Sequence, residues 1–465
     1  MPQQSTRALV LGAGLAGTLA ASVLARHVDR VTVVERDRFE PGAAHRKGVP
    51  HARHAHVLLA AGARALEELL PGVTRDLTAA GARHLGLPNQ LLTHTQAGWL
   101  PRLAEMQFLI GCSRALLDRT VRERVLADDR VELVEAADVV GLSGDRARVT
   151  GARVRDRGTG GERELTADLV VDATGRGSRA DRWLADLGLP PVREDLVDSG
   201  MVYATRVYRA PAGAEGFPGV NIQGDPTTDR VARGGVLLPI EGGRWVVSLG
   251  GTRGGEPADL APEGFTAYAR GLRHPAIADL ISAAEPLTRP YGFHATVNRH
   301  RRYERMTPWP VNFAVMGDAA CTFNPVYGHG MTVLARQALA LRDHLERHGP
   351  DHADRLQRAL AAETADAWAM AVGQDQRYPA TTGPRRGRAA RLLDRYLDRM
   401  VVTATGRPSV TKAQIDTYTL SAPLSRLLHP ATVLGVLRGP AHPPPADVPF
   451  TPAELAVLAR GDRSS

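Results

Sequence analysis

A carboxylate, a proline and two closely spaced glycines follow one another in the segment MGDAACTFNPVYGHGM, residues 316–331. The apolar residues 313–316 lead into this segment, and such an apolar run is typical of a buried strand. The segment therefore predicts a strand, a glycine-bearing loop and a helix that begins near Gly330. Taken alone, this pattern has two interpretations: Asp318 binds a ligand in the loop, or it caps a connection between a strand and a helix.

A second candidate site is the N-terminal sequence RALVLGAGLAGTLAASVLARHVDRVTVVERD, residues 7–37. It predicts a strand, a glycine turn, a helix and a second strand, with Glu35 eighteen residues after Gly17. In this pattern Gly12 permits the sharp turn, Gly14 lets a pyrophosphate approach, and Gly17 lets helix and strand pack closely. Phosphates then lie at the helix N-terminus, and the acid accepts hydrogen bonds from an adenosine ribose. We therefore expect a dinucleotide site, although the motif alone does not separate NAD from FAD.

Two later segments repeat the plan of a strand that ends in a glycine turn. RELTADLVVDATGRGSR contains the apolar strand Leu169–Val171, which ends at Asp172. The segment that begins at Trp309 leads through the loop described above into a long helix. Because these segments lie far apart in the sequence, we expect a cofactor domain that is built from non-contiguous parts.

The rest of the chain has a different texture. Alternating apolar strands with glycine and proline turns fill 189–289, whereas 346–465 is helical and rich in arginine and alanine. We expect an α/β fold with a Rossmann-like domain, a β-sheet domain and a helical C-terminal region. The predicted boundaries are 1–188 and 290–345 for the two parts of the cofactor domain, 189–289 for the β-sheet domain and 346–465 for the C-terminal region.

Charge and cysteine content narrow the class of protein. The formal net charge is +8, but only Lys47 and Lys412 are lysines, and the arginines are mixed with acids, as in RLLDRYLDRM. This pattern favours a solvated arginine-rich surface over a nucleic-acid site. Cys112 and Cys321 are too few for a disulfide framework, which fits a reducing cytoplasm.

One uncharged run, residues 8–25, reaches the lower limit for a membrane span and follows an arginine, as a signal peptide would. It contains three glycines of the turn motif and leads directly into a strand. We therefore expect neither a signal peptide nor an integral membrane segment.

Three motifs, in this order, carry a resemblance to a known family. GAGLAG, DATGRGS and GDAACTFNPVYGHGM resemble the flavoprotein monooxygenases of the p-hydroxybenzoate hydroxylase fold, in particular bacterial FAD-dependent epoxidases and hydroxylases of polyketide and terpenoid tailoring, with squalene epoxidase more distant. The likeness extends to RKGVPHARHAHVLLAAGARALEELLPG and GGVLLPIEGGRWVVSLGG, so it covers most of residues 7–345. It implies FAD as the cofactor and makes the sheet at 189–289 the substrate domain. It also implies that WAMAVGQDQRYP packs back on the FAD domain.

The resemblance assigns roles to the opening segment. Asp318 matches an aspartate that hydrogen-bonds the ribityl chain of FAD. Pro325–Gly330 would pass beside the isoalloxazine ring, where glycines place no side chain between backbone and flavin. The helix that follows would direct its N-terminus at the N1–C2 edge of the ring.

Further positions match the family one by one. Arg114 matches an arginine that reaches the FAD phosphates, and Val139 matches a main-chain contact to the adenine. Arg46 matches an arginine near the flavin, with Arg53 in the turn that follows. The predicted FAD-binding residues are therefore Gly12, Ala13, Gly14, Leu15, Ala16, Gly17, Glu35, Arg36, Arg46, Arg53, Arg114, Val139, Asp318, Pro325, Gly328, Gly330 and Met331.

The sequence also departs from the family pattern. His51 and Ala52 stand where relatives commonly have Gln and Gly. With His45, His54 and His56 nearby, the segment HRKGVPHARHAH is similar to a metal-binding cluster of histidines. No carboxylate or cysteine accompanies these histidines, so we expect no metal.

A second departure concerns the source of electrons. Hydroxylases that bind NADPH themselves usually have Asp-Gly followed by a serine, and residues 172–175 read DATG. We therefore expect NAD(P)H to supply electrons either directly or through a separate flavin reductase.

The resemblance implies that reduced FAD reacts with O2 to give a C4a-hydroperoxide, which transfers one oxygen to an alkene or aromatic carbon. The implied reaction is epoxidation or hydroxylation of a small lipophilic substrate, a polyketide- or terpenoid-type natural product. No protein nucleophile or base is required, so no catalytic residue is predicted, and Cys321 and Tyr327 are expected to serve packing. The alternatives are a flavin-dependent halogenase, although its WxWxIP motif is absent, an isoprenoid double-bond reductase, and a non-catalytic flavin-binding protein.

Overall fold

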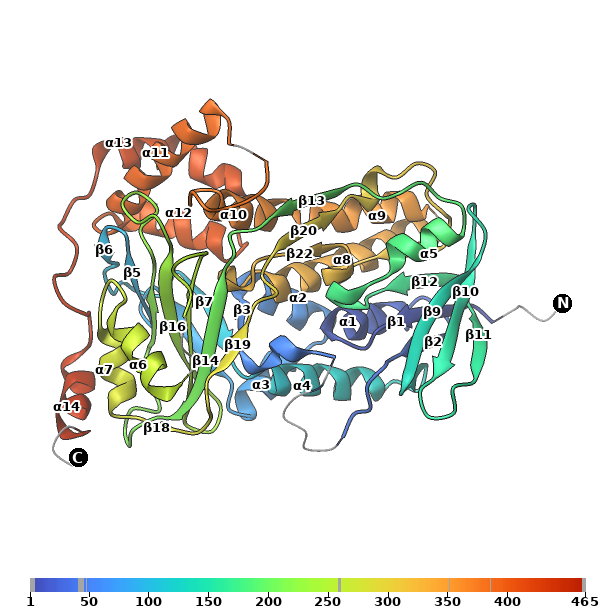
Figure 1. Cartoon of the computed structure of the whole chain (residues 1–465), viewed down its shortest axis with the longest axis horizontal. Coiled ribbons are helices and arrows are strands. Elements are labelled where there is room, and N and C mark those ends of the chain that lie inside the picture. The colour runs from blue at the N-terminus through green and yellow to red at the C-terminus, as the bar shows by residue number, and fades with distance from the viewer. Residues whose placement is uncertain are drawn as a thin grey trace.

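The structure is a computed structural model, and it describes residues 5–40, 46, 48–257, 261–350, 352–384 and 386–461. His45 and Lys47 of the histidine-rich segment therefore lie outside the described residues. An α/β part, a large antiparallel sheet and a cluster of C-terminal helices make up the described chain (Figure 1).

A parallel sheet with the strand order β21–β12–β1–β2–β8 forms the centre of the α/β part. Its strands are β1 (Arg7–Leu11), β2 (Arg30–Val34), β8 (Val131–Val134), β12 (Leu169–Asp172) and β21 (Phe313–Val315). The inner strands are runs of valine and leucine buried on both faces, as expected when other elements cover both sides of a parallel sheet. β12 pairs with β1 on one side and with β21 on the other, which confirms a Rossmann-like sheet made from non-contiguous segments.

Helices cover one face of this sheet, and an antiparallel meander covers the other. The helices on the first face are α1 (Leu15–Leu24), α2 (Ala60–Leu69), α3 (Val73–Ala79), α4 (Arg114–Leu126) and α8 (Gly330–His348). The second face carries β9 (Ala137–Gly144), β10 (Val149–Asp156) and β11 (Glu162–Thr166), together with α5 (Ala180–Asp186). Ser113 caps α4 because its hydroxyl accepts a hydrogen bond from Leu116 N at 3.2 Å.

A large, mainly antiparallel sheet lies beside the α/β part (Figure 1). Its order is β18–β14–β17–β16–β15–β5–β6, with β19 paired to β14. The strands are β5 (Leu91–Thr95), β6 (Gly98–Trp99), β14 (Val202–Arg209), β15 (Gly219–Ile222), β16 (Arg233–Ile240), β17 (Arg244–Gly251), β18 (Glu285–Pro286) and β19 (Tyr291–Phe293). Helices α6 (Pro262–Arg270) and α7 (Ala276–Ser282) share its core.

The large sheet extends beyond the predicted segment 189–289, because β5 and β6 precede residue 189. β5 pairs in parallel with β15, so two distant parts of the chain complete one sheet. The domain boundaries therefore stay a prediction.

Two small antiparallel sheets connect these parts. One contains β3 (Val57–Leu59), β7 (Gln107–Gly111) and β4 (Arg83–Leu87), and the other contains β13 (Glu194–Val197), β20 (Asn298–Arg301) and β22 (Cys321–Thr322). In the second one, β20 pairs with both β13 and β22.

The C-terminal region is helical, as the sequence predicted. It contains α9 (Ala353–Ala362), α10 (Ala365–Asp375), α11 (Arg388–Ala404), α12 (Pro408–Tyr418), α13 (Pro430–Arg438) and α14 (Pro452–Gly461). α10, which contains most of the segment WAMAVGQDQRYP, contacts β20. Within the described residues, no helix is long and apolar enough to cross a membrane.

Candidate cofactor-binding site

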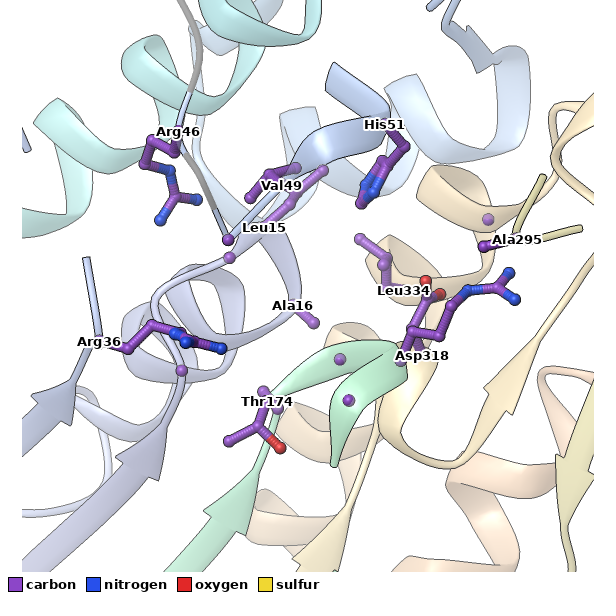
Figure 2. Close-up of a pocket in the computed structure, with 18 of the residues that line it drawn as sticks. Leu15, Ala16, Arg36, Arg46, Val49, His51, Thr174, Ala295, Asp318 and Leu334 are labelled. Carbon is purple, nitrogen blue, oxygen red and sulfur yellow. The ribbon is translucent and has the colours of Figure 1, made fainter. Parts of the chain in front are cut away.

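A cavity of about 830 Å³ opens at the carboxyl ends of β1, β2 and β12. Residues that follow each of these strands line it, among them Gly12, Glu35 and Thr174. In open parallel sheets, ligands bind in the crevice outside the carboxyl ends of the strands. The cavity therefore lies where the topology predicts a cofactor (Figure 2).

The glycine turn after β1 has the geometry that its spacing predicts. Gly12 has a φ of +97°, and a Cβ on it would lie 2.7 Å from Ala173 O. A Cβ on Gly17 would lie only 1.8 Å from Gly12 O, so glycine at 17 allows α1 to pack on β1. A Cβ on Gly14 would meet no protein atom within 4 Å. No side chain caps α1, which leaves its first N–H groups available to an anion in the cavity.

Glu35 is buried at the end of β2 and lines the cavity. Its Oε2 accepts a hydrogen bond from Ala13 N at 2.9 Å, and its Oε1 accepts one from Asp37 N at 3.0 Å. The guanidinium of Arg46 lies 3.3 Å from Oε2. Backbone groups thus fix the carboxylate, while an ionised carboxylate retains lone pairs for further donors such as ribose hydroxyls.

Arginines gather at this end of the cavity. Arg114 is buried, and its Nε donates a hydrogen bond to Asp118 at 2.7 Å. Arg46 lies 3.9 Å from the other oxygen of Asp118 and stacks on Phe39 at 4.7 Å. Arg36 also lines the cavity, and Figure 2 shows Arg36 and Arg46 on the side opposite Asp318. Arg46 therefore lies beside Glu35 and away from the Asp318 end, whereas the resemblance implied a place near the flavin. This concentration of guanidinium groups suits the phosphates of a dinucleotide.

Asp318 lies in the short turn η4 (Gly317–Ala319), directly after β21. It lines the cavity, and none of the described residues donates a hydrogen bond to its carboxylate. Burial raises the pKa of Asp318, and the positive charges of Arg176 and Arg114 partly oppose this shift. A carboxylate that lines a cavity and accepts no hydrogen bond from the protein is suited to hydroxyl groups of a ligand.

The loop after β22 forms the remaining wall at this end. It contains the turn η5 (Pro325–Tyr327), and Gly328 follows with a φ of +72°. α8 begins at Gly330, as predicted, and no side chain caps it. A Cβ on Gly330 would meet no protein atom within 4 Å. The first N–H groups of α8 are therefore free to face a ligand in the cavity.

The structure brings most of the predicted residues together. The cavity is lined by Gly12, Gly14, Leu15, Ala16, Glu35, Arg36, Arg46, Arg114, Val139, Asp318, Pro325, Gly328, Gly330 and Met331. Ala13 and Gly17 support the turn without lining the cavity. Arg53 does not line it either, because it is exposed and stacks on Tyr291 at 4.9 Å.

Several cavity residues were not predicted. Thr174, Gly175 and Arg176 follow β12 and line the cavity. Burial lowers the pKa of Arg176, and the negative charge of Asp318 opposes this shift. The DATGRGS motif already contained the signal, because a polar glycine turn after a buried strand lies at the same sheet edge as the other two turns.

His51 and His56, which belong to the histidine-rich segment, also line the cavity. Burial and nearby Arg114 lower the pKa of His51 well below its ordinary value and that of His56 to about 4. Their rings are 5.8 Å apart. Among the described residues, no group of three or more His, Cys, Asp or Glu side chains is arranged to hold a metal ion.

The groups that line the cavity, and its volume, fit FAD. The open space beside Gly14 matches the close approach of a pyrophosphate, and the fixed Glu35 carboxylate matches a ribose. The unsatisfied Asp318 carboxylate and the uncapped start of α8 match a polyhydroxyl chain and a ring with polar edges. A volume of about 830 Å³ lies within the usual range for cofactor sites.

Comparison with known proteins agrees with this geometry. Residues 8–182 match the family described as FAD dependent oxidoreductase. Protein Rv3254 of Mycobacterium tuberculosis is 34% identical over 392 residues, which cover 81% of this chain and 82% of that protein. A kynurenine 3-monooxygenase of Salinispora arenicola is 27% identical over 384 residues, with 78% and 77% coverage.

A solved structure shares the fold. The crystal structure of pqsL, a probable FAD-dependent monooxygenase from Pseudomonas aeruginosa, superposes with a TM-score of 0.56 at 20% identity and covers 90% of this chain and 100% of that chain. Together with the geometry of the site, these comparisons identify the family. The chain belongs to the FAD-dependent oxidoreductases and is an enzyme of the monooxygenase type with the p-hydroxybenzoate hydroxylase-like fold.

Proposed function

We propose that the enzyme inserts one oxygen atom from O2 into a lipophilic polyketide- or terpenoid-type natural product, by epoxidation or hydroxylation. One observation carries the proposal. A single cavity has the Glu35 carboxylate and arginines at one end and Asp318 at the other, and aromatic side chains line part of its wall. The first end suits the adenosine of FAD, and the second suits its ribityl chain and ring.

The residues of the chain then have distinct tasks. Glu35 accepts hydrogen bonds from the ribose, and Asp318 accepts them from the ribityl hydroxyls. The guanidinium groups of Arg46 and Arg114 balance the charge of the phosphates. The positive end of α8 stabilises negative charge at the edge of the ring. FAD itself, when bound and reduced, supplies the activation of O2.

The wall near Asp318 supports an apolar substrate. Tyr203 of β14 and Phe293 of β19 line the cavity, and their rings lie 5.2 Å apart. Burial raises the pKa of Tyr203, so its phenol stays neutral. Burial and cationic neighbours likewise keep His51 neutral at pH 7. These neutral and aromatic side chains give this part of the wall an apolar surface that favours a lipophilic molecule.

Halogenation is less well supported. The described part of the chain offers one lysine, Lys412, and it lies on α12 rather than on the cavity wall. Its Nζ donates hydrogen bonds to both oxygens of Asp416, at 2.9 Å and 2.8 Å. This lysine is therefore not positioned to direct an oxidised halide from the cavity.

The test is incubation of the purified, FAD-loaded protein with candidate polyketides and terpenoids, NAD(P)H and ¹⁸O2, with and without a flavin reductase. We expect denaturation to release noncovalent FAD and mass spectrometry to show one ¹⁸O atom in the product. Product without the reductase would assign direct use of NAD(P)H, and product only with it would assign a partner reductase. Chlorinated or hydrogenated product, or no O2 consumption with any substrate, would overturn the proposal.

A further inference from the structure

A buried carboxylate of the C-terminal region reaches the loop beside the cavity. Asp375 is the last residue of α10 and is 1% exposed. Its Oδ1 accepts a hydrogen bond from the Tyr327 hydroxyl at 2.6 Å, and its Oδ2 accepts one from Asn298 Nδ2 at 2.6 Å. Asn324 Nδ2 donates to both oxygens, at 3.2 Å and 3.1 Å. The site described above does not use this carboxylate.

These three side chains present donors to Asp375, and the Ser199 side chain also hydrogen-bonds the carboxylate. Such an arrangement suits an ionised carboxylate, which only accepts hydrogen bonds. An amide in its place would, in either orientation, direct an N–H₂ group at the amide donor of Asn324, which contacts both oxygens of Asp375. Replacement of Asp375 by the isosteric Asn therefore disrupts the cluster without changing its volume. This makes Asp375→Asn a sharper probe than truncation.

The cluster fixes both ends of one turn. Asn324 and Tyr327 flank Pro325 and Val326, so a single carboxylate holds the first and last positions of the segment. Asn298 Oδ1 also accepts a hydrogen bond from Asn324 N at 2.7 Å. Within the turn itself, Asn324 Oδ1 accepts one from Val326 N at 3.3 Å. These long-range contacts supply much of the order that a turn this short lacks by itself.

The same turn forms part of the cavity wall. Asn324, Pro325 and Gly328 line the cavity, and α8 starts two residues after Gly328. A Cβ on Gly328 would lie 2.6 Å from a methyl group of Val57, so this backbone has little freedom to shift toward β3. The position of the loop therefore decides where its backbone faces the ring end of the cavity.

We propose that Asp375 is a positioning residue for the cofactor: through Asn324 and Tyr327, it fixes the backbone of Pro325–Gly328 against the flavin ring. The inference rests on the proposed placement of the FAD ring at the Asp318 end. It gives the C-terminal region, which lies outside the matched segment 8–182, a direct part in the cofactor site.

The test compares Asp375→Asn and Tyr327→Phe with the wild-type protein. For each, FAD affinity is measured by titration of the apoprotein, and the environment of the bound ring by visible circular dichroism and midpoint potential at saturating FAD. We expect Asp375→Asn to weaken FAD binding at least tenfold and to change both ring signals. Tyr327→Phe should change FAD affinity and the ring signals in the same direction but less, because the donors of Asn298 and Asn324 remain.

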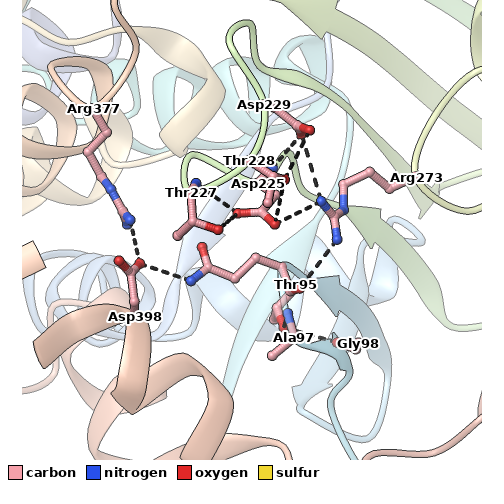
Figure 3. Close-up of polar contacts among 11 residues, drawn as sticks. Thr95, Ala97, Gly98, Asp225, Thr227, Thr228, Asp229, Arg273, Arg377 and Asp398 are labelled. Atoms are coloured by element: carbon pink, nitrogen blue, oxygen red, sulfur yellow. Dashed lines mark hydrogen bonds and ion pairs between the residues drawn. The ribbon is translucent and has the colours of Figure 1, made fainter. Parts of the chain in front are cut away.

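Asp398 provides the matched control. It is another carboxylate of the C-terminal region, partly rather than fully buried, and it accepts hydrogen bonds from Arg377 and from Gln96 Nε2, the latter at 2.9 Å (Figure 3). None of its hydrogen bonds or ion pairs within the described chain involves the 324–328 loop. Asp398→Asn should lower thermal stability while leaving FAD affinity and the ring signals unchanged.

Three results would overturn the inference. In the first, Asp375→Asn is less stable but binds FAD with wild-type affinity and unchanged ring signals, which makes Asp375 purely structural. In the second, Asp398→Asn alters the ring signals to the same extent, which makes the effect a general loosening of the C-terminal region. In the third, Asp375→Asn does not fold, and Tyr327→Phe binds FAD with unchanged ring signals. Failure of the wild-type protein to bind FAD would instead refute the proposed function, and the inference with it.

Discussion

The two ends of the cavity are held in different ways. At the first end, backbone N–H groups of Ala13 and Asp37 fix Glu35, and all three residues belong to one continuous strand–helix–strand segment and the turn that follows it. At the second end, no described residue donates a hydrogen bond to Asp318. The neighbouring loop is instead held by Asp375, which comes from another part of the chain.

This difference separates local order from order imposed by tertiary contacts. The Glu35 carboxylate accepts hydrogen bonds from two backbone N–H groups, so it is held in place before any ligand binds. The Asp318 carboxylate faces the cavity and accepts no hydrogen bond from a described residue, so its lone pairs are left for ligand hydroxyls. The first end should therefore contribute to protein stability as well as binding, and the second mainly to binding.

The largest expected effect tests the local end. Gly17→Ala places a Cβ 1.8 Å from Gly12 O, where backbone on both sides cannot yield. We expect a loss of about 4 kcal/mol or more of unfolding free energy, measured by urea unfolding. Gly14→Ala is the matched control, since its Cβ meets no protein atom within 4 Å. It should fold normally yet bind FAD at least tenfold more weakly, and normal FAD affinity would contradict a pyrophosphate at this position.

The next effect contrasts the two carboxylates. Asp318→Ala and Glu35→Ala should each remove a charge-assisted hydrogen bond worth about 1.5–3 kcal/mol, which corresponds to about ten- to a hundredfold weaker FAD binding. Thermal unfolding of the apoproteins should distinguish the two variants by their stability. Asp318→Ala should be as stable as the wild type or more stable, whereas Glu35→Ala should lose about 1–3 kcal/mol because two buried N–H groups lose their acceptor.

Added FAD controls for folding defects in both variants, because a ligand that binds the native state raises the melting temperature by mass action. Equal destabilisation of the two apoproteins would remove the distinction between the ends. Unchanged FAD affinity in Asp318→Ala would refute the role of Asp318 at the ribityl chain.

Acidification should affect the loop at the second end. Burial lowers the pKa of His329, between Gly328 and Gly330, from 6.5 to about 4. Between these values the unfolded state binds more protons than the folded state, so the free energy of unfolding falls as the pH falls from about 6.5 to about 4. This histidine accounts for about 2 kcal/mol between pH 7 and pH 5.

Urea unfolding of His329→Gln at both pH values measures the contribution. Gln can still donate to Tyr418 O, which lies 3.2 Å from the imidazole Nε2. The variant should lose less stability than the wild type on acidification, by about 2 kcal/mol. His348→Gln, at the exposed end of α8, controls for the loss of a histidine. An unchanged pH dependence in His329→Gln would show that burial does not hold this imidazole neutral.

The smallest effect concerns two arginines that the sequence placed together. Arg53→Ala should leave FAD affinity within about twofold, because an exposed side chain outside the cavity contributes little. Arg46→Ala should weaken binding several-fold, because Arg46 lines the cavity beside Glu35. Titration of both apoproteins with FAD measures the difference, and a larger effect for Arg53 would reverse our assignment.

The sequence predicted the elements whose geometry is local. The turn at Gly12, the close packing at Gly17 and the acid at Glu35 belong to one continuous segment, where spacing alone fixes the distances. The start of α8 at Gly330 and the strand before Asp318 were predicted for the same reason. The Rossmann-like fold class followed from three such strand–turn segments.

Only the tertiary structure decided how distant segments meet. The sequence gives no sign that β5 pairs with β15, that Arg46 lies beside Glu35, or that Asp375 holds Asn324 and Tyr327. Periodicity and spacing report which face of an element is buried, but not which element from elsewhere covers that face. The Glu35 end could therefore be predicted almost completely, whereas the loop at the other end depends on side chains far from it in the sequence.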